Sequence, residues 1–143
     1  MEIKDRCKYS QTGVYTIKEF DTDKDYDEYS SWFKHLGFDA PTKNILSTLG
    51  FTVKNDIDIC SGFLYISNSS LAYIEFVIAN PKAKRGDRKE AVSFLLTHLQ
   101  ELAKSKGYEL IMIITATPGF SNNLVKNFGY IKGPKSIEHY KHI

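Results

Sequence analysis

Basic side chains gather in one short segment of this sequence. Lys82, Lys84, Arg85, Arg88 and Lys89 lie within eight residues, whereas the whole chain carries 19 Lys and Arg against 17 Asp and Glu. An amphipathic helical pattern follows at once, so these cations would stand beside the free N–H groups and the positive dipole end of a helix. That position favours a phosphate-bearing ligand. The alternative is a solvated loop that keeps the surface soluble.

The overall composition limits what the protein can do. With 143 residues, 42% hydrophobic and 25% charged, the chain matches a single soluble domain spanning 1–143. A formal net charge of +2 does not favour general binding to nucleic acid or to a membrane. Cys7 and Cys60 lack metal-type spacing and the histidines lack helical partners, so we expect no metal. The charged start is unlike a signal peptide, which predicts a reduced, cytoplasmic protein.

The first half of the sequence predicts a strand, two helices and three antiparallel strands. Residues 14–20 are rich in β-branched and aromatic side chains, and the adjacent Asp21 is a favoured helix cap. Aromatic residues at helical spacing and a stop at Gly37 complete the first helix. We expect a shorter helix from Pro41 to Gly50. Strands are expected at 51–54, 57–66 and 71–80, with Asn55-Asp56 as a two-residue turn between the first two.

The second half predicts a strand, a helix and a strand in parallel arrangement. Apolar residues recur at helical spacing from Asp87 to a stop at Gly107, and Asp87 with Glu90 is typical of a capping box. Residues 110–116 form an apolar run, typical of a strand buried on both faces. The expected fold class is α/β, an α+β mixed sheet in which antiparallel N-terminal strands precede a βαβ parallel pair. A short helix at 122–128 and closing strands at 130–131 and 137–142 follow.

Two motifs resemble those of the GCN5-related N-acetyltransferase (GNAT) family. The segment Arg88-Lys89-Glu90-Ala91-Val92-Ser93 is similar to the family's Gln/Arg-x-x-Gly-x-Gly/Ala, with Ala91 and Ser93 in place of the two glycines. A start at Lys84 would put Asp87 on the first glycine and make the helix too long, so we prefer Arg88. Phe128-Gly129-Tyr130 resembles the Leu-Gly-Phe before the family's sixth strand. The order of elements also resembles the family's.

The resemblance implies a GNAT-like acyl-CoA N-acyltransferase fold and transfer of an acetyl group from acetyl-coenzyme A to an amine. The amine would attack the thioester directly, with no metal. The acceptor implied is a small-molecule amine, a protein lysine or a protein N-terminus. By the same resemblance the pantetheine arm would contact Val77, Ile78 and Ala79. The remaining coenzyme-binding residues would be Arg88, Lys89, Ala91, Val92, Ser93 and Asn122.

Glu75 is the residue that the resemblance implies as a general base, because it is the only acid on the strand at 71–80. Strict alternation would put it on one face with Tyr73, Val77 and Ala79. Apolar neighbours would raise its pKa toward the working pH, which suits a base. The alternative is a carboxylate that is paired with a cation or exposed. The family's usual general acid, a tyrosine, falls on Val125, which cannot donate a proton.

Two other functions fit the same sequence. The loss of both motif glycines and of the tyrosine fits a catalytically inactive GNAT-fold protein that binds coenzyme A or a partner. The basic segment at 82–89, with Tyr73 or Tyr108 nearby, fits a nucleic-acid-binding module. The nearly neutral total charge disfavours this last alternative.

Overall fold

The computed structural model describes residues 15–143, so the expectations for Val14 and Cys7 lie outside the described residues. The chain divides into two compact units. The first ends at Ile113, and its described residues, 15–113, carry a sheet with two α-helices. The second, Ile114–Ile143, carries one α-helix.

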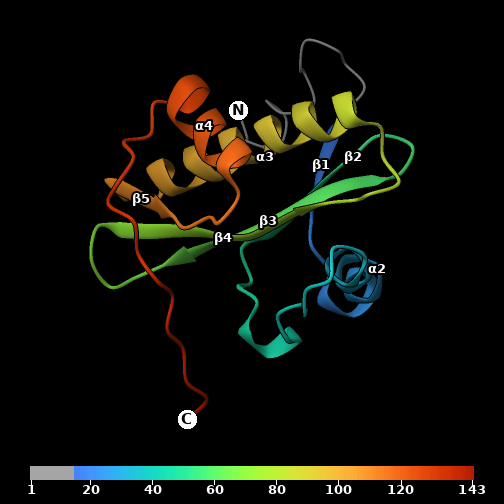
Figure 1. Cartoon of the computed structure of the whole chain (residues 1–143), viewed down its shortest axis with the longest axis horizontal. Coiled ribbons are helices and arrows are strands. Elements are labelled where there is room, and N and C mark those ends of the chain that lie inside the picture. The colour runs from blue at the N-terminus through green and yellow to red at the C-terminus, as the bar shows by residue number, and fades with distance from the viewer. Residues whose placement is uncertain (1–14) are drawn as a thin grey trace. The chain divides into compact units, whose positions relative to one another are not determined.

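The first unit is built on a mixed sheet in which strand order follows chain order. The first four strands pair antiparallel, and the last two pair parallel. The predicted mixed α/β fold class is therefore confirmed, and so is the βαβ unit. The strands, visible in Figure 1, are β1 (Thr16–Glu19), β2 (Gly50–Lys54), β3 (Asp58–Ile66), β4 (Leu71–Ala79) and β5 (Leu110–Ile113).

Within residues 15–113, helices α2 (Thr22–His35) and α3 (Arg85–Ser105) cover opposite faces of the sheet (Figure 1). Neighbouring residues of β3 point to these two faces in turn. A Cβ on Gly62 would lie only 2.9 Å from the Leu95 side chain of α3. The next side chain, Phe63, packs instead with Tyr29 of α2. The core therefore has two layers, one on each side of the sheet.

Helix α2 forms for the predicted reasons. The Asp21 side chain accepts hydrogen bonds from the Asp23 and Lys24 N–H groups, at 3.0 and 3.1 Å. Gly37 has a φ of +82°, the left-handed conformation that ends many helices. Tyr29 and Trp32 are buried on the apolar face. None of the helices within residues 15–143 is long and apolar enough to cross a membrane.

The predicted helix from Pro41 to Gly50 is wrong. Only a short 3-10 helix, η1 (Lys43–Ile45), forms there. Contacts with β3 replace the helical hydrogen bonds: the Tyr65 hydroxyl donates to the Ile45 carbonyl at 2.7 Å, and the Ser47 hydroxyl donates to the Leu64 carbonyl at 2.6 Å. Tertiary hydrogen bonds thus override local helix propensity in this segment.

Two strand predictions need correction. The turn between β2 and β3 has three residues, 55–57, because the ladder shifts register between Val53 and Lys54. The prediction of a β5 buried on both faces is also wrong. This strand lies at the edge of the sheet and ends at Ile113, and its Leu110 and Met112 are exposed.

The second unit contains α4 (Pro118–Phe128), which begins before the predicted residue 122. It ends as predicted at Gly129, with φ +72°. The closing strands predicted at 130–131 and 137–142 are not formed, and residues 131–143 are exposed. A strand needs a neighbour for its main-chain groups, and no strand lies within this unit.

Candidate functional site

The candidate site lies where β4 and β5 part. Strand β5 pairs with Leu71–Ile74 alone, whereas β4 continues through Glu75–Ala79 beside β3. The Asn80 N–H donates to the Ile59 carbonyl of β3, so alternation directs the main-chain groups of Ile78 toward β3 and those of Ala79 away from it. The last residues of β4 therefore present main-chain groups along an edge that β5 does not pair with.

Phe76 makes a bulge in the middle of β4. Residues Phe63 and Ser61 of β3 pair with Glu75 and Ile78, so β4 holds one more residue than β3 between these pairs. Phe76 has a φ of +57° and is the only non-glycine residue with positive φ among residues 15–143. Positive φ is costly for a bulky side chain and is concentrated at functional sites.

The bulge corrects the expected faces of β4. Glu75 lies opposite Phe63 on the face that α2 covers, together with Tyr73, as expected. Val77 lies on the other face, since its side chain would meet a Cβ on Gly62 beside Leu95. Ala79 pairs with Cys60, two residues from Gly62 in β3, and shares that other face. The expectation that Val77 and Ala79 share a face with Glu75 is therefore wrong, because the extra residue reverses the alternation.

Glu75 is half-buried among aromatic side chains. Phe63 lies opposite it, and Tyr65 lies on the same face. Burial raises the pKa of the Tyr65 phenol, the Ser47 N–H lowers it, and the negative charge of Glu75 raises it further. The Tyr65 hydroxyl is bound to main-chain groups of Ile45 and Ser47, so it holds that segment in place. The charge of Glu75 thus acts on a phenol that is itself fixed by the main chain.

A buried asparagine fixes the turn that leaves β4. Asn80 is 3% exposed, and its side-chain amide donates to the Asp58 carbonyl at 2.8 Å and accepts from the Lys82 N–H at 2.9 Å. Its main-chain carbonyl also accepts from the Ala83 N–H at 3.1 Å. The path of the basic segment is thus set before the helix begins.

Helix α3 begins earlier than predicted, at Arg85, with Lys84 as its cap. The Lys84 side chain makes no capping hydrogen bond, so the predicted capping box is wrong. Asp87 instead accepts a hydrogen bond from the Tyr15 hydroxyl at 2.9 Å. The first helical main-chain bond runs from the Arg88 N–H to the Lys84 carbonyl, at 2.9 Å. The N–H groups without helical partners are those of residues 84–87.

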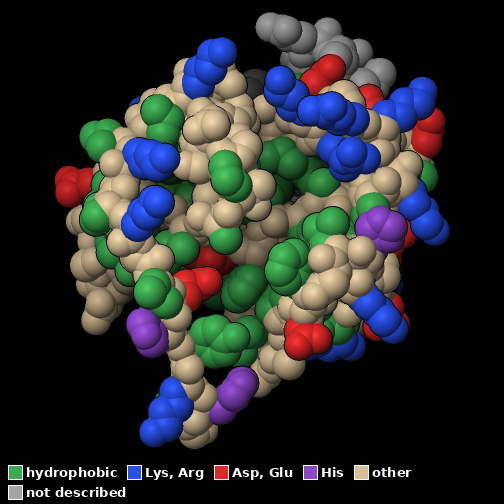
Figure 2. Space-filling view, viewed as in Figure 1, with side chains coloured by type: hydrophobic (Ala, Val, Ile, Leu, Met, Phe, Trp, Pro, Cys, Tyr) green, Lys and Arg blue, Asp and Glu red, His purple; other side chains and the backbone are tan. Residues whose placement is uncertain are grey.

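The basic side chains around this helix start differ in what they contact. Lys82, Lys84, Arg85 and Lys89 are exposed, and Figure 2 shows Lys and Arg side chains gathered over the beginning of α3. The Arg88 guanidinium turns back instead and donates to the main-chain carbonyls of the loop at Pro81 and Ala83. Arg88 therefore braces the loop, and the other four cations face solvent.

The remaining predicted residues of this helix lie within its regular part. Ala91 is completely buried, and the Ser93 hydroxyl donates to the Lys89 carbonyl at 3.1 Å. Inside an α-helix the N–H of each residue bonds to the carbonyl four residues earlier. The N–H groups of Ala91, Val92 and Ser93 are therefore occupied within α3, and the free donors lie one to two turns before them.

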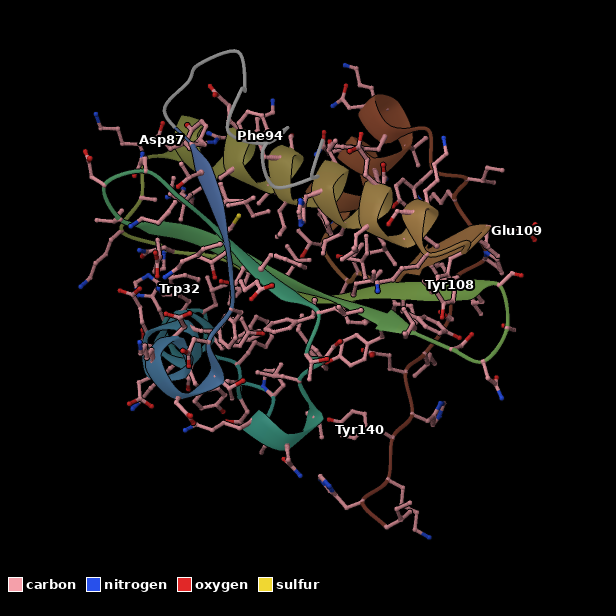
Figure 3. The ribbon with its side chains drawn as sticks, turned by 180° about the vertical axis from the view of Figure 1, so that it is seen from behind. Trp32, Asp87, Phe94, Tyr108, Glu109 and Tyr140 are labelled. Carbon is pink, nitrogen blue, oxygen red and sulfur yellow. The ribbon has the colours of Figure 1, made fainter. Side chains whose placement is uncertain are left out.

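The start of β1 is joined to the start of α3. Tyr15 is 2% exposed, and its ring packs on Phe94 with 5.4 Å between centroids. Burial raises the pKa of the Tyr15 phenol to about 12, and its hydrogen bond to Asp87 and the charge of Asp87 add to the shift. Figure 3 shows Asp87 at the beginning of α3 and Phe94 further along the same helix. The helix end that carries the cations is thus held against the sheet.

The second unit carries two further residues named from the sequence. Asn122 is exposed on α4, and Val125 is 43% exposed. Neither makes a contact within that unit that assigns it a chemical role. Among residues 15–143, no group of His, Cys, Asp or Glu side chains is arranged to hold a metal ion.

Sequence reasoning missed three residues that shape the site: Tyr15, Tyr29 and Asn80. Each is buried, and each directs a polar group at main chain or at a carboxylate. A tyrosine at a buried position of a helix pattern is a signal, because a buried hydroxyl needs a partner. Asn80 before Pro81 is likewise typical of a turn.

Comparison with known proteins gives a result at the level of structure. No protein-family model matches the sequence. No curated protein matches it by sequence either. Many solved structures share the fold, at sequence identities too low to transfer an activity.

Three of these structures illustrate the likeness. The ribosomal-protein-S18-alanine N-acetyltransferase from Escherichia coli has a TM-score of 0.66 at 14% identity, covering 84% of this chain and 79% of that one. An aminoglycoside acetyltransferase from an uncultured soil metagenomic sample, in complex with sisomicin, has a TM-score of 0.64 at 12% identity, covering 92% and 98%. N-acetylglutamate synthase from Neisseria gonorrhoeae, complexed with coenzyme A and L-arginine, has a TM-score of 0.62 at 15% identity, covering 77% and 26%. The chain therefore has the fold of the GCN5-related N-acetyltransferases.

Proposed function

We propose that the protein is an N-acetyltransferase that binds acetyl-coenzyme A along the free edge of β4 and transfers the acetyl group to an amine. One observation carries the proposal: β4 parts from β5 after Ile74, and a helix start with exposed cations follows soon after β4 ends at Ala79. An extended thioester arm needs main-chain groups to lie along, and a pyrophosphate needs N–H donors and positive charge. Residues 75–89 supply both requirements in one continuous stretch.

Each part of this stretch has a proposed role. Val77 and Ala79 hold the pantetheine arm through main-chain groups. Ile78 pairs with β3 and thereby keeps this stretch of β4 in place. The N–H groups of residues 84–87, with the side chain of Lys89, hold the pyrophosphate. Arg88 acts by shaping the loop, in keeping with its bonds to the Pro81 and Ala83 carbonyls. The contacts predicted for Ala91, Val92, Ser93 and Asn122 stay predictions.

The chemistry requires one proton to move from the acceptor. The bound thioester supplies an electrophilic carbonyl carbon. As the amine nitrogen forms its bond to that carbon, Glu75 takes the proton that the nitrogen loses, and the carbon–sulfur bond breaks to release the thiolate. Glu75 suits this role because it is a carboxylate on the first residue of β4 beyond the pairing with β5.

The acceptor is an amine on a small molecule or a protein. Two of the structures that share the fold act on such groups by their names, one on a ribosomal-protein alanine and one on an aminoglycoside. Neither of these acceptors is assigned to this chain, because the likeness is one of fold.

A second candidate function is coenzyme binding without turnover. It is favoured by Val125, which stands where the family motif has a proton-donating tyrosine. A valine cannot protonate the leaving thiolate. Coenzyme A has a thiol of moderate pKa, so its thiolate can leave without a donor, and the active form is the better supported of the two.

Coenzyme A binding is the first test. A ligand that binds only the folded state stabilises it, by about 2.7 kcal/mol at a hundredfold excess over the dissociation constant. Coenzyme A should therefore raise the melting temperature. Lys89→Glu should weaken binding about tenfold or more, since it reverses charge beside the helix start. The matched control is Lys104→Glu in the last turn of the same helix, which should bind as the parent does.

An unchanged melting temperature at millimolar ligand would remove coenzyme A from the proposal. Equal weakening by Lys89→Glu and Lys104→Glu would indicate a general charge effect and would move the pyrophosphate away from the helix start.

Turnover is the second test. Release of the coenzyme A thiol from acetyl-coenzyme A is followed with a panel of primary amines as acceptors. Glu75→Gln should lower turnover by about a hundredfold and flatten the acid limb of the pH profile, while acetyl-coenzyme A binding stays normal. Parental turnover with the same pH profile would make Glu75 structural. Binding without thiol release for any amine would favour the second candidate function.

A further inference from the structure

The bulge in β4 depends on a conformation that Phe76 does not favour by itself. Its φ of +57° lies in the left-handed region, which is strained for a bulky residue. Such a conformation persists only where neighbouring groups hold it. The groups that hold Phe76 therefore decide how the free end of β4 is presented.

One side chain reaches the main chain of this residue from the opposite layer. The Tyr29 hydroxyl of α2 donates a hydrogen bond to the Phe76 carbonyl at 3.0 Å. Tyr29 is 1% exposed, and burial raises the pKa of its phenol, so the hydroxyl stays a donor at all working pH values. This hydrogen bond joins α2 to the main chain of the bulge.

The Tyr29 ring has little freedom to move. It packs edge-to-face on Phe20, Phe33 and Phe63, with centroid separations of 5.2, 5.2 and 5.6 Å. Edge-to-face pairs of this kind fix ring orientation as well as position. The hydroxyl is consequently aimed at one point on β4, and that point is the bulge.

Holding this carbonyl also fixes the next N–H group. The Phe76 carbonyl and the Val77 N–H belong to one planar trans peptide and point in opposite directions. Rotation of that peptide would break the bond to Tyr29 and turn the Val77 N–H away from its present direction. Tyr29 thus sets the direction of a donor at the beginning of the free edge of β4.

We propose that Tyr29 is a positioning residue for the coenzyme: it holds the bulge of β4 so that the free edge presents its main-chain groups to the pantetheine arm. This inference rests on the proposed function. Tyr29 itself touches no reacting atom. Tyr29 affects the binding of the pantetheine arm, which lies along β4. It does not affect the binding of the phosphates, which are held at the start of α3.

The helix offers a matched control. Tyr26 lies one turn earlier on α2, and its hydroxyl donates to the Pro41 carbonyl at 2.7 Å. Tyr26→Phe and Tyr29→Phe each remove one hydroxyl that binds a main-chain carbonyl. Both substitutions keep the ring, so the aromatic packing is preserved. Tyr26→Phe removes the donor to the Pro41 carbonyl, whereas Tyr29→Phe removes the donor to the Phe76 carbonyl.

Titration calorimetry with two ligands tests the inference. Coenzyme A carries the pantetheine arm, and adenosine 3′,5′-bisphosphate does not. Tyr29→Phe should weaken coenzyme A binding about tenfold, as expected for a lost hydrogen bond, and leave adenosine 3′,5′-bisphosphate binding within about twofold. Tyr26→Phe should leave both affinities within about twofold of the parent.

Hydrogen exchange gives a second readout that needs no ligand. Amides of the segment 76–79 should exchange faster in Tyr29→Phe than in the parent or in Tyr26→Phe, under conditions where circular dichroism shows all three folded. This measurement also serves if Tyr29→Phe is too unstable for calorimetry at ordinary temperature, because it can be made in the cold.

Each outcome decides the matter. Coenzyme A binding at parental strength by Tyr29→Phe, or parental exchange at 76–79, overturns the inference and leaves the proposed function standing. Equal loss of both ligands in Tyr29→Phe overturns it too, since the role is then general stability. A parent protein that binds neither ligand contradicts the proposed function, and the inference falls with it.

Discussion

At the scale of the single residue, the conformation of Phe76 reverses the usual order of stability between alanine and glycine in a strand. Glycine in a strand is usually less favourable than alanine, because it loses more conformational freedom on folding. At a φ of +57° the order reverses, since glycine adopts this conformation without strain. Phe76→Gly and Phe76→Ala both remove the ring, so the comparison isolates the backbone.

We expect Phe76→Gly to be more stable than Phe76→Ala by about 1 kcal/mol. Urea unfolding of the two variants measures the difference. A more stable alanine variant would contradict the left-handed conformation at this position.

Tyr15 predicts a dependence of stability on pH in the alkaline range. Its phenol has an ordinary pKa of 10.0 and a pKa of about 12 in the folded protein, where burial and Asp87 oppose ionisation. A raised pKa means that the folded state holds the proton more tightly than the unfolded state. The stability gained is fully present below the unfolded pKa and is lost as pH rises through the folded pKa.

The parent should therefore be more stable than Tyr15→Phe by a margin that is constant below about pH 9 and shrinks between about pH 10 and 12. Urea midpoints of both proteins across this range give the margin. If it stays constant up to the highest pH, the Tyr15 proton does not contribute to folding.

At the scale of the element, Asn80 joins the end of β4 to the basic loop. Asn80→Ala would remove the side-chain partners of the Asp58 carbonyl and the Lys82 N–H. A buried polar group left without its partner costs about 1–3 kcal/mol. The whole substitution should cost at least that much, measured by urea unfolding. Asn55→Ala is the control, because its side chain binds one exposed N–H group in a turn, and its effect should be much smaller.

The sequence predicted elements well where local signals and the fold agree. Asp21 caps α2, and Gly37, Gly107 and Gly129 all adopt positive φ beyond helix ends, as their places in the pattern indicated. Local signals predicted the wrong element where a side chain distant in the sequence determines the backbone conformation. The segment around Ile45 and Ser47 has a helical sequence pattern, yet the Ile45 carbonyl bonds to the Tyr65 hydroxyl and the Ser47 hydroxyl bonds to the Leu64 carbonyl.

The candidate site was likewise predicted only in part from the sequence. The basic segment and the strand before it were identifiable, because charge and periodicity are visible in a sequence. The bulge at Phe76 was not, since nothing in an alternating strand marks which residue lacks a partner across the ladder. Its consequence, the separation of Val77 from the face of Glu75, therefore needed the three-dimensional register. The residue that could have indicated the bulge is Tyr29, because its buried hydroxyl needs a hydrogen-bond partner.

At the scale of the whole molecule, the described chain ends in a stretch without helix or strand. Residues 131–143 are exposed, and Lys132, Lys135 and Lys141 lie among them. Exposed irregular segments are preferred sites of proteolysis. Limited trypsin should cut after these lysines before it cuts at Lys104 or Arg88 in α3, and mass spectrometry identifies the order. Early cleavage within α3 would contradict a stable helix over Arg85–Ser105.

The order of the strands has a consequence for synthesis. Since the sheet runs β1-β2-β3-β4-β5, every strand pairs with the one made just before it. A ribosome releases the chain from its N-terminus at about 5–20 residues per second, so each strand meets a neighbour that has already emerged. The β1–β2 pairing must wait for α2, and the β4–β5 pairing must wait for α3. The four antiparallel strands can therefore assemble first, and α3 then arrives at a surface that is already built to receive it.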